Sequence, residues 1–460
     1  MSPRSDAKAS MRVLTRAEVL TESARVDRDL VIIGERVYDL TTWVDRHPGG
    51  RLPIRLMRGR DATDVFTSTH PVDVRKRYLH VFEYGTLSDA CPSELEVDFR
   101  ELTAQFVAEG LFSTDPMYYV MKMTSLLVLL ALVVWAVVRD AHPVLSGMGL
   151  GLFWQQIAFI GHDLGHCSVS HVRDADTMIG MVCGNLLGGI SLGWWKRSHN
   201  VHHIVTNSVE NDPDIQHLPV FAVTDRYLSE PVYSTFYSRI LPLNALARCL
   251  CRYQHWLYYP VMAVARFNLY AQSLLYVFAM GPYKAPEIVW HRSVQQASLV
   301  LFWVWHIALI MHVRTWPSRL VFVLVSHALA GLLHVQITLS HFSMPTYAGV
   351  TYTEHDNGFV LTQLRHSMNV SCSPYMDWLH GGLQFQVEHH LWPRLPRHNL
   401  RTAQARLRAL VEKHNLPYEA KSFWNANLAT IRKLRQVSMS QQPGAPSIST
   451  IFLDGLNLFG

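Results

Sequence analysis

Four long apolar stretches constrain the fold of this 460-residue chain more than any other feature. They run near residues 118–138, 143–161, 295–314 and 318–340, and each approaches the roughly 20 residues that a helix needs to span a bilayer. Short polar connections join them into two hairpins, so the long segments outside the hairpins all emerge on one side of the membrane. The expected fold class is an α-helical multi-pass membrane protein with four spanning helices, and the apolar share of 49% agrees with it.

Two further apolar stretches, at 178–195 and 256–281, are interrupted by Gly188-Gly189 and by Arg266 and Asn268. We interpret them as interfacial or re-entrant helices. The first twenty residues contain charges every few positions and no apolar core of a secretory signal, so we expect the N-terminal part in the cytosol. The hairpins then place residues 162–294 and everything after 341 in the cytosol too, where most lysines and arginines fall.

The remaining segments predict a two-domain organisation. Residues 10–87 read as a small soluble α+β domain, with strands at 30–33 and 37–40 around a turn. Residues 88–116 suit a linker, 117–425 form the membrane domain, and the tail at 437–460, rich in Ser, Gln and Pro, is expected to be disordered.

Composition excludes some functions. The net charge of +5 is spread out, without the basic stripe of a nucleic-acid-binding surface. Six scattered cysteines form no Cys-x-x-Cys pair and no disulfide-like framework, which fits a reducing compartment. The 25 histidines are more than packing needs, and histidine is the commonest transition-metal ligand.

Seven of these histidines form three clusters. A spacing of four places His162 and His166 on one helix face at the end of the second span. A lone pair of this kind is structural more often than not, but three clusters on one side of the membrane favour metal binding. Imidazole suits iron, copper, zinc and nickel, so the ligands alone do not name the metal. The other two clusters are His199, His202 and His203, and Gln386 with His389 and His390.

The order of these clusters around four spans resembles the membrane fatty-acyl and sphingolipid desaturases over residues 117–425. The resemblance implies two iron ions held almost wholly by histidine. Gln386 stands where other branches have histidine, which marks the front-end branch, whose members tend to carry a fused cytochrome b5 domain. It also implies a further ligand at the end of the fourth span, for which His341 is the candidate and His334 a weaker one. We interpret the remaining span histidines, His306, His312 and His327, as structural.

The N-terminal domain resembles cytochrome b5 over residues 10–87, through His47-Pro48-Gly49-Gly50 and the later His70. The resemblance implies haem b with His47 and His70 as axial ligands. A haem with both axial positions filled carries electrons without binding oxygen. Arg58-Gly59-Arg60 departs mildly from the family pattern, which we expect to alter surface charge more than haem binding.

Together these features predict an oxygen-dependent lipid desaturase, because breaking an unactivated C–H bond requires a metal and O2. The expected electron source is NADH–cytochrome b5 reductase, and the expected location is the endoplasmic reticulum membrane. The run at 194–219, with Asp212-Pro213-Asp214, looks more like sphingolipid Δ8 desaturases than Δ6 or Δ5 fatty-acyl enzymes.

Three alternatives stay open: a Δ6, Δ5 or Δ8 polyunsaturated fatty-acyl desaturase, a lipid hydroxylase of the same superfamily, and a haem-bearing metal carrier or transporter. The last is disfavoured because transporters place polar ligands at mid-membrane, whereas these clusters lie at and beyond the ends of spans.

Some residues near the clusters have secondary roles in this interpretation. Trp194, Trp195 and Trp378 either line a lipid channel or, as interfacial tryptophans commonly do, anchor the chain. Asp163 and Glu388 are expected to orient ligand imidazoles.

Overall fold

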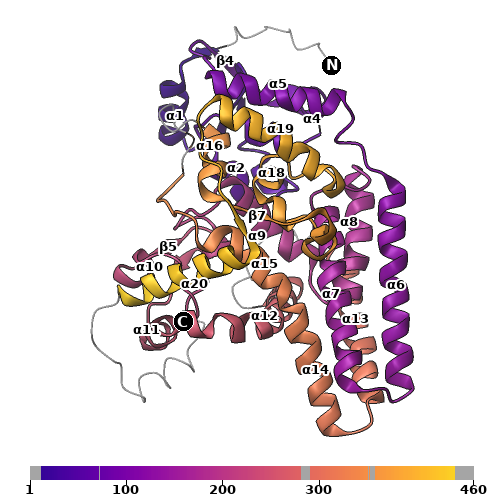
Figure 1. Cartoon of the computed structure of the whole chain (residues 1–460). Helices are drawn as coiled ribbons and strands as arrows, with labels where there is room; N and C mark the ends of the chain where they lie inside the picture. The colour runs from indigo at the N-terminus through magenta and orange to yellow at the C-terminus, as the bar shows by residue number, and fades with distance from the viewer. Residues whose placement is uncertain (1–11, 72, 281–290, 351, 353–357, 441–460) are drawn as a thin grey trace, which may run out of the picture. The chain divides into compact units, whose positions relative to one another are not determined.

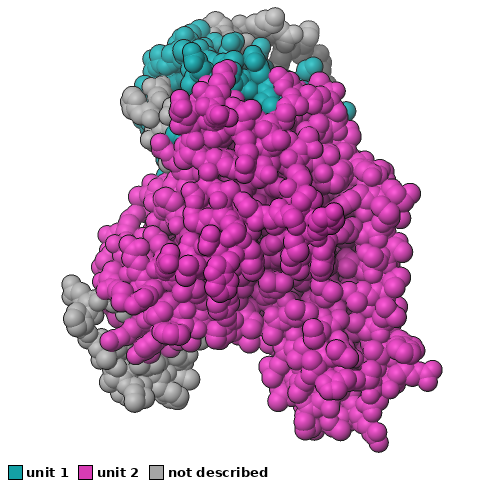
Figure 2. Space-filling model, viewed as in Figure 1, with its two compact units in different colours: residues 1–104, 350–362 teal, residues 105–349, 363–460 magenta. Residues whose placement is uncertain are grey.

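The computed structural model describes residues 12–71, 73–280, 291–350, 352 and 358–440, and it divides into two compact units (Figure 2). Unit 1 comprises residues 1–104 and 350–362, and unit 2 comprises residues 105–349 and 363–460. The tail expected to be disordered lies outside the described residues from 441 onward.

Unit 1 is built on a four-stranded sheet with the order β1-β4-β3-β2. The predicted hairpin is confirmed: β2 (Leu30–Ile33) pairs antiparallel with β3 (Arg36–Asp39), and Gly34 between them has a φ of 66°. β1 (Arg12–Leu14) runs parallel to β4 (Glu83–Leu87) at the other edge. The helices of this unit are α1 (Arg16–Arg25), η1 (Val44–Arg46), α2 (Arg51–Leu56), α3 (Thr63–Thr69), α4 (Val74–Tyr78) and η2 (Leu79–Phe82).

The stretch expected to be a linker, 88–116, contains helix α5 (Glu94–Ala108). Ser93 and Glu96 form a capping box at its start: the Ser93 amide donates to the Glu96 carboxylate (2.7 Å), and the Glu96 amide donates to Ser93 Oγ (3.3 Å). Arg100 binds Asp64 through two hydrogen bonds, so the first part of α5 packs within unit 1.

The described part of unit 2 contains four helical segments long and apolar enough to span a membrane, in agreement with the predicted fold class. They are α6 (Pro116–Val138), α7 (Pro143–Gly165), α13 (Arg292–His312) and Trp316–Phe342, which joins α14 (Trp316–Ala330) to α15 (Leu332–Phe342). Figure 1 shows α6 and α7 side by side, as are α13 and α14. Of the apolar windows, 67% of α7 is buried but only 17% of α6, so α7 is central and α6 presents most of its surface to lipid.

The first interrupted apolar stretch forms a sharply bent helix pair. The segment Arg173–Leu187, made of α8 (Arg173–Met181) and the π-helical η3 (Val182–Leu187), meets α9 (Leu192–Ile204) at 112°. Gly189 at the break has a φ of 72°, and a Cβ there would lie 2.3 Å from the Phe302 ring, so only glycine fits. The bend has the shape of a re-entrant segment and directs α9 toward the end of α7.

The second interrupted stretch forms one helix, α12 (Gln254–Val277), which does not reach the hydropathy of a span and contains Pro260. It packs against α14, α15 and α20 (Phe423–Met439). Residue 281, the end of the predicted stretch, lies outside the described residues.

The other elements of unit 2 form the cap at the ends of the spans. They surround a core in which Tyr258, Leu339 and Leu434 are fully buried. In chain order they are η4 (Pro213–Ile215), α10 (Arg226–Ser229), β5 (Tyr233–Ser234), β6 (Arg239–Ile240), α11 (Ala245–Arg252), α16 (Gly358–His366, which begins in unit 1), β7 (Asn369–Ser371), η6 (Pro374–Met376), α17 (Asp377–His380), η7 (Leu383–Phe385), α18 (Gln386–Leu391), η8 (Arg397–Asn399), α19 (Leu400–Lys413) and β8 (Ala420–Ser422).

Candidate metal centre

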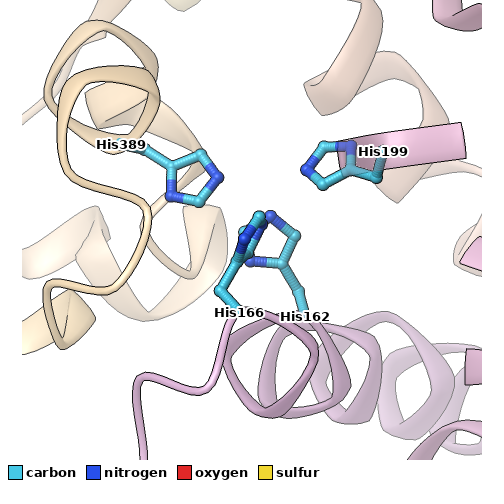
Figure 3. Close-up of side chains that lie close together, drawn as sticks. All are labelled: His162, His166, His199 and His389. Atoms are coloured by element: carbon cyan, nitrogen blue, oxygen red, sulfur yellow. The ribbon is translucent and has the colours of Figure 1, made fainter. Parts of the chain in front are cut away.

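Four histidines from three helices converge on one point of unit 2 (Figure 3). His162 lies in the last turn of α7 with His166 directly after it, while His199 comes from α9 and His389 from α18. One ring nitrogen from each lies within 4.8 Å of the others. We call these four residues the first histidine group.

Three more histidines form a second histidine group: His202 from α9, His341 from α15 and His390 from α18. Their ring nitrogens also lie within 4.8 Å of one another, and all three side chains are buried. His341 therefore lies beside residues of the second and third clusters, as expected for a further ligand. His334, two turns earlier on α15, is in neither group, and its Nδ1 lies 3.1 Å from the Met262 carbonyl oxygen.

His203 lies between the two groups. Its ring stacks on His390 with centroids 4.3 Å apart and lies 4.7 Å from those of His166 and His389. Its Nε2 is 3.1 Å from Nε2 of His199. His203 is thus close enough to serve either group.

The nitrogens in these groups fit metal ions. Nε2 of His166, His389 and His390 and Nδ1 of His341 are buried, with no hydrogen-bond partner among the described residues. Such atoms are costly unless something binds them, and four of them converging on two points fit two ions held by neutral imidazoles. Burial, reinforced by the neighbouring imidazoles, holds the pKa of His389 and His390 well below the usual range, so both rings are neutral, as ligands must be.

Side chains behind the histidines hold the rings in place. Nδ1 of His202 lies 2.9 Å from the Asp212 carboxylate, and Nδ1 of His199 lies 3.2 Å from that of Asp214. These contacts keep the proton on Nδ1, so that Nε2 is the nitrogen that binds metal. The Asp-Pro-Asp run was visible in the sequence, but nothing in the sequence indicated that its carboxylates face the second cluster.

Gln363 holds the third cluster in a similar way. Its side-chain oxygen accepts a hydrogen bond from Nδ1 of His390 (2.9 Å), and its amide nitrogen donates to the carbonyl oxygen of His203 (3.0 Å). No motif in the sequence marked this glutamine.

The expectation that Asp163 and Glu388 orient imidazoles is met only in part, because Asp163 lies beside His162 whereas Glu388 binds other side chains. The Asp163 carboxylate lies 3.7 Å from Nδ1 of His162, an ion-pair distance, and it also accepts hydrogen bonds from Tyr119 (2.6 Å) and Arg397 (2.5 Å). Glu388 accepts from Asn369 and Tyr418. Adjacent residues on a helix point about 100° apart, so the Glu388 carboxylate does not face the His389 ring that follows it in sequence.

The other residues singled out in the sequence lie in different parts of unit 2. Gln386 is buried at the start of α18, one turn before His389. Trp195 stacks on the His199 ring with centroids 4.4 Å apart, so it packs directly on the first group. His306 and His327 are buried among the spans beside Trp154.

In unit 1, His47 and His70 face each other with ring centroids 5.8 Å apart, a spacing that one iron atom bound to both rings would bridge. Nδ1 of His47 lies 2.9 Å from the Gly50 carbonyl oxygen, and Nδ1 of His70 lies 3.1 Å from that of Phe66. Both rings thus present Nε2 as the ligand nitrogen. Burial lowers the pKa of His47, which keeps its ring neutral.

Four spans with two histidine groups at one end, joined to a domain with paired axial histidines, define a class of protein: membrane-bound oxidoreductases that combine a haem with a second metal centre. Comparison with known proteins identifies the family. The fatty acid desaturase model matches residues 141–422, and the model of the cytochrome b5-like haem/steroid binding domain matches residues 15–88. The chain belongs to the fatty acid desaturase family, and its cofactors are haem and a di-iron centre.

Named relatives are similar over most of their length. The chain is 38% identical to the Delta(8)-fatty-acid desaturase 2 of Arabidopsis thaliana over 94% of both chains. It is 38% identical to the Delta 8-(E)-sphingolipid desaturase of Emericella nidulans, over 86% of this chain and 73% of that one. It is 36% identical to the Acyl-lipid (9-3)-desaturase of Borago officinalis, over 89% and 90%.

Proposed function

We propose that this protein is a front-end sphingolipid Δ8 desaturase. It removes two hydrogens from adjacent carbons of the long-chain base, while O2 accepts them together with two electrons and two protons to give two molecules of water. The observation that carries the proposal is the pair of histidine groups at one end of four spans, in a chain that also holds a haem domain. The di-iron centre, when loaded, supplies the oxidising power that no side chain has.

We assign the ligands as follows. His47 and His70 hold the haem. The first and second histidine groups, with His203 between them, hold the two irons, and Gln386 lies close enough in sequence to His389 to act as a ligand or to shape its surroundings. Asp212, Asp214 and Gln363 fix which ring nitrogens face the metals.

The cell supplies the electrons one at a time. We propose NADH–cytochrome b5 reductase as the donor to the haem domain, because a haem with two histidine ligands passes single electrons without reacting with oxygen. Covalent attachment keeps the haem at a high effective concentration near the di-iron centre. We place the protein in the endoplasmic reticulum membrane with both metal sites on the cytosolic side, where that reductase works.

A fatty-acyl substrate is the second candidate. The Borago relative is named an acyl-lipid desaturase, and the Arabidopsis relative is named a fatty-acid desaturase. Other relatives favour a sphingolipid substrate, because they are named sphingolipid desaturases. One of them, from Lachancea kluyveri, is 40% identical to this chain. A hydroxylase with the same centre would retain an oxygen atom in its product.

Expression in a yeast lacking this activity, with sphingoid bases and supplied polyunsaturated fatty acids both profiled by mass spectrometry, tests the proposal. We expect a Δ8 double bond in the long-chain base. New double bonds only in fatty acids would establish the second candidate, and a hydroxylated base would establish the hydroxylase. If oxygen uptake stays at background with lipid, NADH and reductase present, the result would favour the alternative of a haem-bearing metal carrier.

A further inference from the structure

One buried asparagine lies between the segments that carry His202 and His341. Asn207 follows α9, is 0% exposed and has a φ of 64°. This left-handed conformation is open to asparagine but uncommon for most other residues. The turn runs beside the segment after α15, because the Tyr347 amide donates to the Asn207 carbonyl oxygen (3.2 Å) and the Val209 amide donates to that of Tyr347 (2.8 Å). Asn207 is thus placed where the ends of two ligand-bearing helices meet.

The side chain of Asn207 binds the end of α15. Its amide nitrogen donates to the carbonyl oxygens of His341 (3.0 Å) and Pro345 (3.1 Å). Carbonyl oxygens only accept, so the group that faces both of them must be the NH2. The regular helical partner of the His341 carbonyl would be the amide four residues further on, but that residue is Pro345, which has no N–H. Asn207 therefore supplies, from another part of the chain, a donor that α15 cannot supply itself.

The backbone amide of the same residue reaches the other ligand. It donates to the Asp212 carboxylate (2.7 Å), and the same carboxylate oxygen lies 2.9 Å from Nδ1 of His202. Asn207 is therefore connected to His202 through its backbone and to the helix of His341 through its side chain. The third member of the second histidine group, His390, is held separately by Gln363.

The link made by the Asn207 side chain serves one histidine group. The first histidine group takes its rings from α9, α18 and the end of α7, whereas the second group takes His341 from α15. If the end of α15 is freed from the turn after α9, the spacing of His202 and His341 changes. The four rings of the first group do not depend on that spacing.

We propose that Asn207 is a positioning residue for the second histidine group: its side chain sets His341 at the distance from His202 that one iron ion requires. This inference rests on the proposed function, which assigns these rings to iron. Groups that orient metal ligands contribute to metal affinity, and their removal typically lowers it roughly 10- to 100-fold. Loss of the Asn207 side chain is therefore expected to weaken the binding of one iron and to spare the other.

Asn207→Gly tests the proposal without straining the turn, because glycine adopts a positive φ freely. The full-length protein is purified in dodecyl maltoside and dialysed against a graded iron chelator, and haem iron and non-haem iron are counted separately. We expect the affinity for one of the two non-haem irons to fall about tenfold or more. The affinity for the other iron and the absorption spectrum of the haem should match the wild type.

Two further variants separate the hydrogen bonds from the fold. Asn207→Asp keeps the size and backbone preference of asparagine but replaces the donor with a carboxylate oxygen, so it should also weaken one iron. Asn415→Gly makes the same substitution at an exposed asparagine with a φ of 50° after α19, and it should retain both irons. Retention of both irons in Asn207→Gly, or loss of both together, would overturn the proposal.

The iron count and the lipid product are separate readouts. Selective loss of one iron in Asn207→Gly, with no desaturated product from any lipid in the wild type, would support the role of Asn207 and overturn the proposed function. A wild type that desaturates the long-chain base, together with an Asn207→Gly variant that keeps both irons, would have the opposite meaning.

Discussion

His202 and Asp212 show how a single buried pair prepares a metal ligand. The two side chains are 2% and 0% exposed, and the carboxylate lies 2.9 Å from Nδ1. Asp212 also accepts hydrogen bonds from the backbone amides of Asn207 (2.7 Å) and Asp214 (2.9 Å), so its own position is set by the turn that follows α9. A carboxylate held in this way fixes both the orientation and the tautomer of the imidazole.

Replacing Asp212 with asparagine tests this role. The change keeps the shape of the side chain but removes its charge, and the amide can turn its NH2 toward Nδ1. We expect iron affinity to fall roughly 10- to 100-fold, as is typical when such a partner is removed. Iron per chain, measured by inductively coupled plasma mass spectrometry after dialysis against a graded chelator, gives the result.

The matched control is Asp225→Asn, at an exposed aspartate before α10 whose carboxylate lies 3.3 Å from the Thr224 hydroxyl. It should bind iron as the wild type does. Equal iron retention in both variants would show that Asp212 has no part in holding the metal.

The buried pair of Arg397 and Asp163 has a different consequence at the same scale. Both side chains are 8% exposed. Arg397→Leu leaves the carboxylate buried without its charged partner, although the Tyr119 hydroxyl still donates to it, and we expect a loss of about 3–5 kcal/mol in stability. Thermal unfolding in detergent measures it. The double variant Arg397→Leu/Asp163→Asn should recover much of the loss, and a double variant no more stable than the single one would contradict this explanation.

Among the elements, α7 and α14 form an extensive contact in which the two backbones approach closely. A Cβ at Gly151 would lie 2.5 Å from the Ser326 carbonyl oxygen and 2.8 Å from Cβ of Leu329, and one at Gly147 would lie 2.9 Å from the Phe322 carbonyl oxygen. Small residues at such contacts let helices in membranes approach closely. The approach matters for the site because α7 carries His162 and α14 leads into the helix of His341.

We therefore expect Gly151→Ala to force the two helices apart. Overpacking of this kind costs about 1–3 kcal/mol, which exceeds the roughly 1 kcal/mol that alanine gains as a helix former. The Tm in detergent should fall by several degrees, and iron retention should fall with it. Thr124→Leu, which adds bulk on the exposed face of α6, should change neither, and an unchanged Tm for Gly151→Ala would show that the contact can relax.

For the whole molecule, the two compact units each carry one cofactor site. His47 and His70 lie in unit 1, and both histidine groups lie in unit 2. Because no histidine is shared between the two kinds of site, each cofactor can load without the other.

This independence predicts a reciprocal result. His389→Ala should abolish the desaturated product and leave the absorption spectrum of the haem unchanged. His47→Ala should remove the haem spectrum, retain non-haem iron, and also abolish product with NADH and reductase, because the path for electrons is broken. Optical spectra, iron content and product should be measured on the same preparations. Retained activity in His389→Ala would remove that residue from the proposed ligands.

Much of this architecture was determined by the sequence alone. A span is a run of apolar residues of a given length, and a histidine cluster is a short spacing on one helix, so both are local properties that no distant contact needs to supply. The four spans, the β2–β3 hairpin and the three histidine clusters were all predicted for this reason. The break at Gly188-Gly189 was also recognisable in the sequence, because paired glycines interrupt an apolar helix.

Only the tertiary structure decided how the histidines are divided between the two histidine groups. His199 and His203 lie one turn apart on α9, yet His199 faces the first group, His202 faces the second and His203 lies between them, since successive positions on a helix point in different directions. Their partners Asp212, Asp214 and Gln363 come from segments up to about 160 residues away in the chain. Nothing local distinguishes Asp212 and Asp214 from Glu388 as the carboxylates that face the imidazoles, because which side chains meet is decided only when the helices pack.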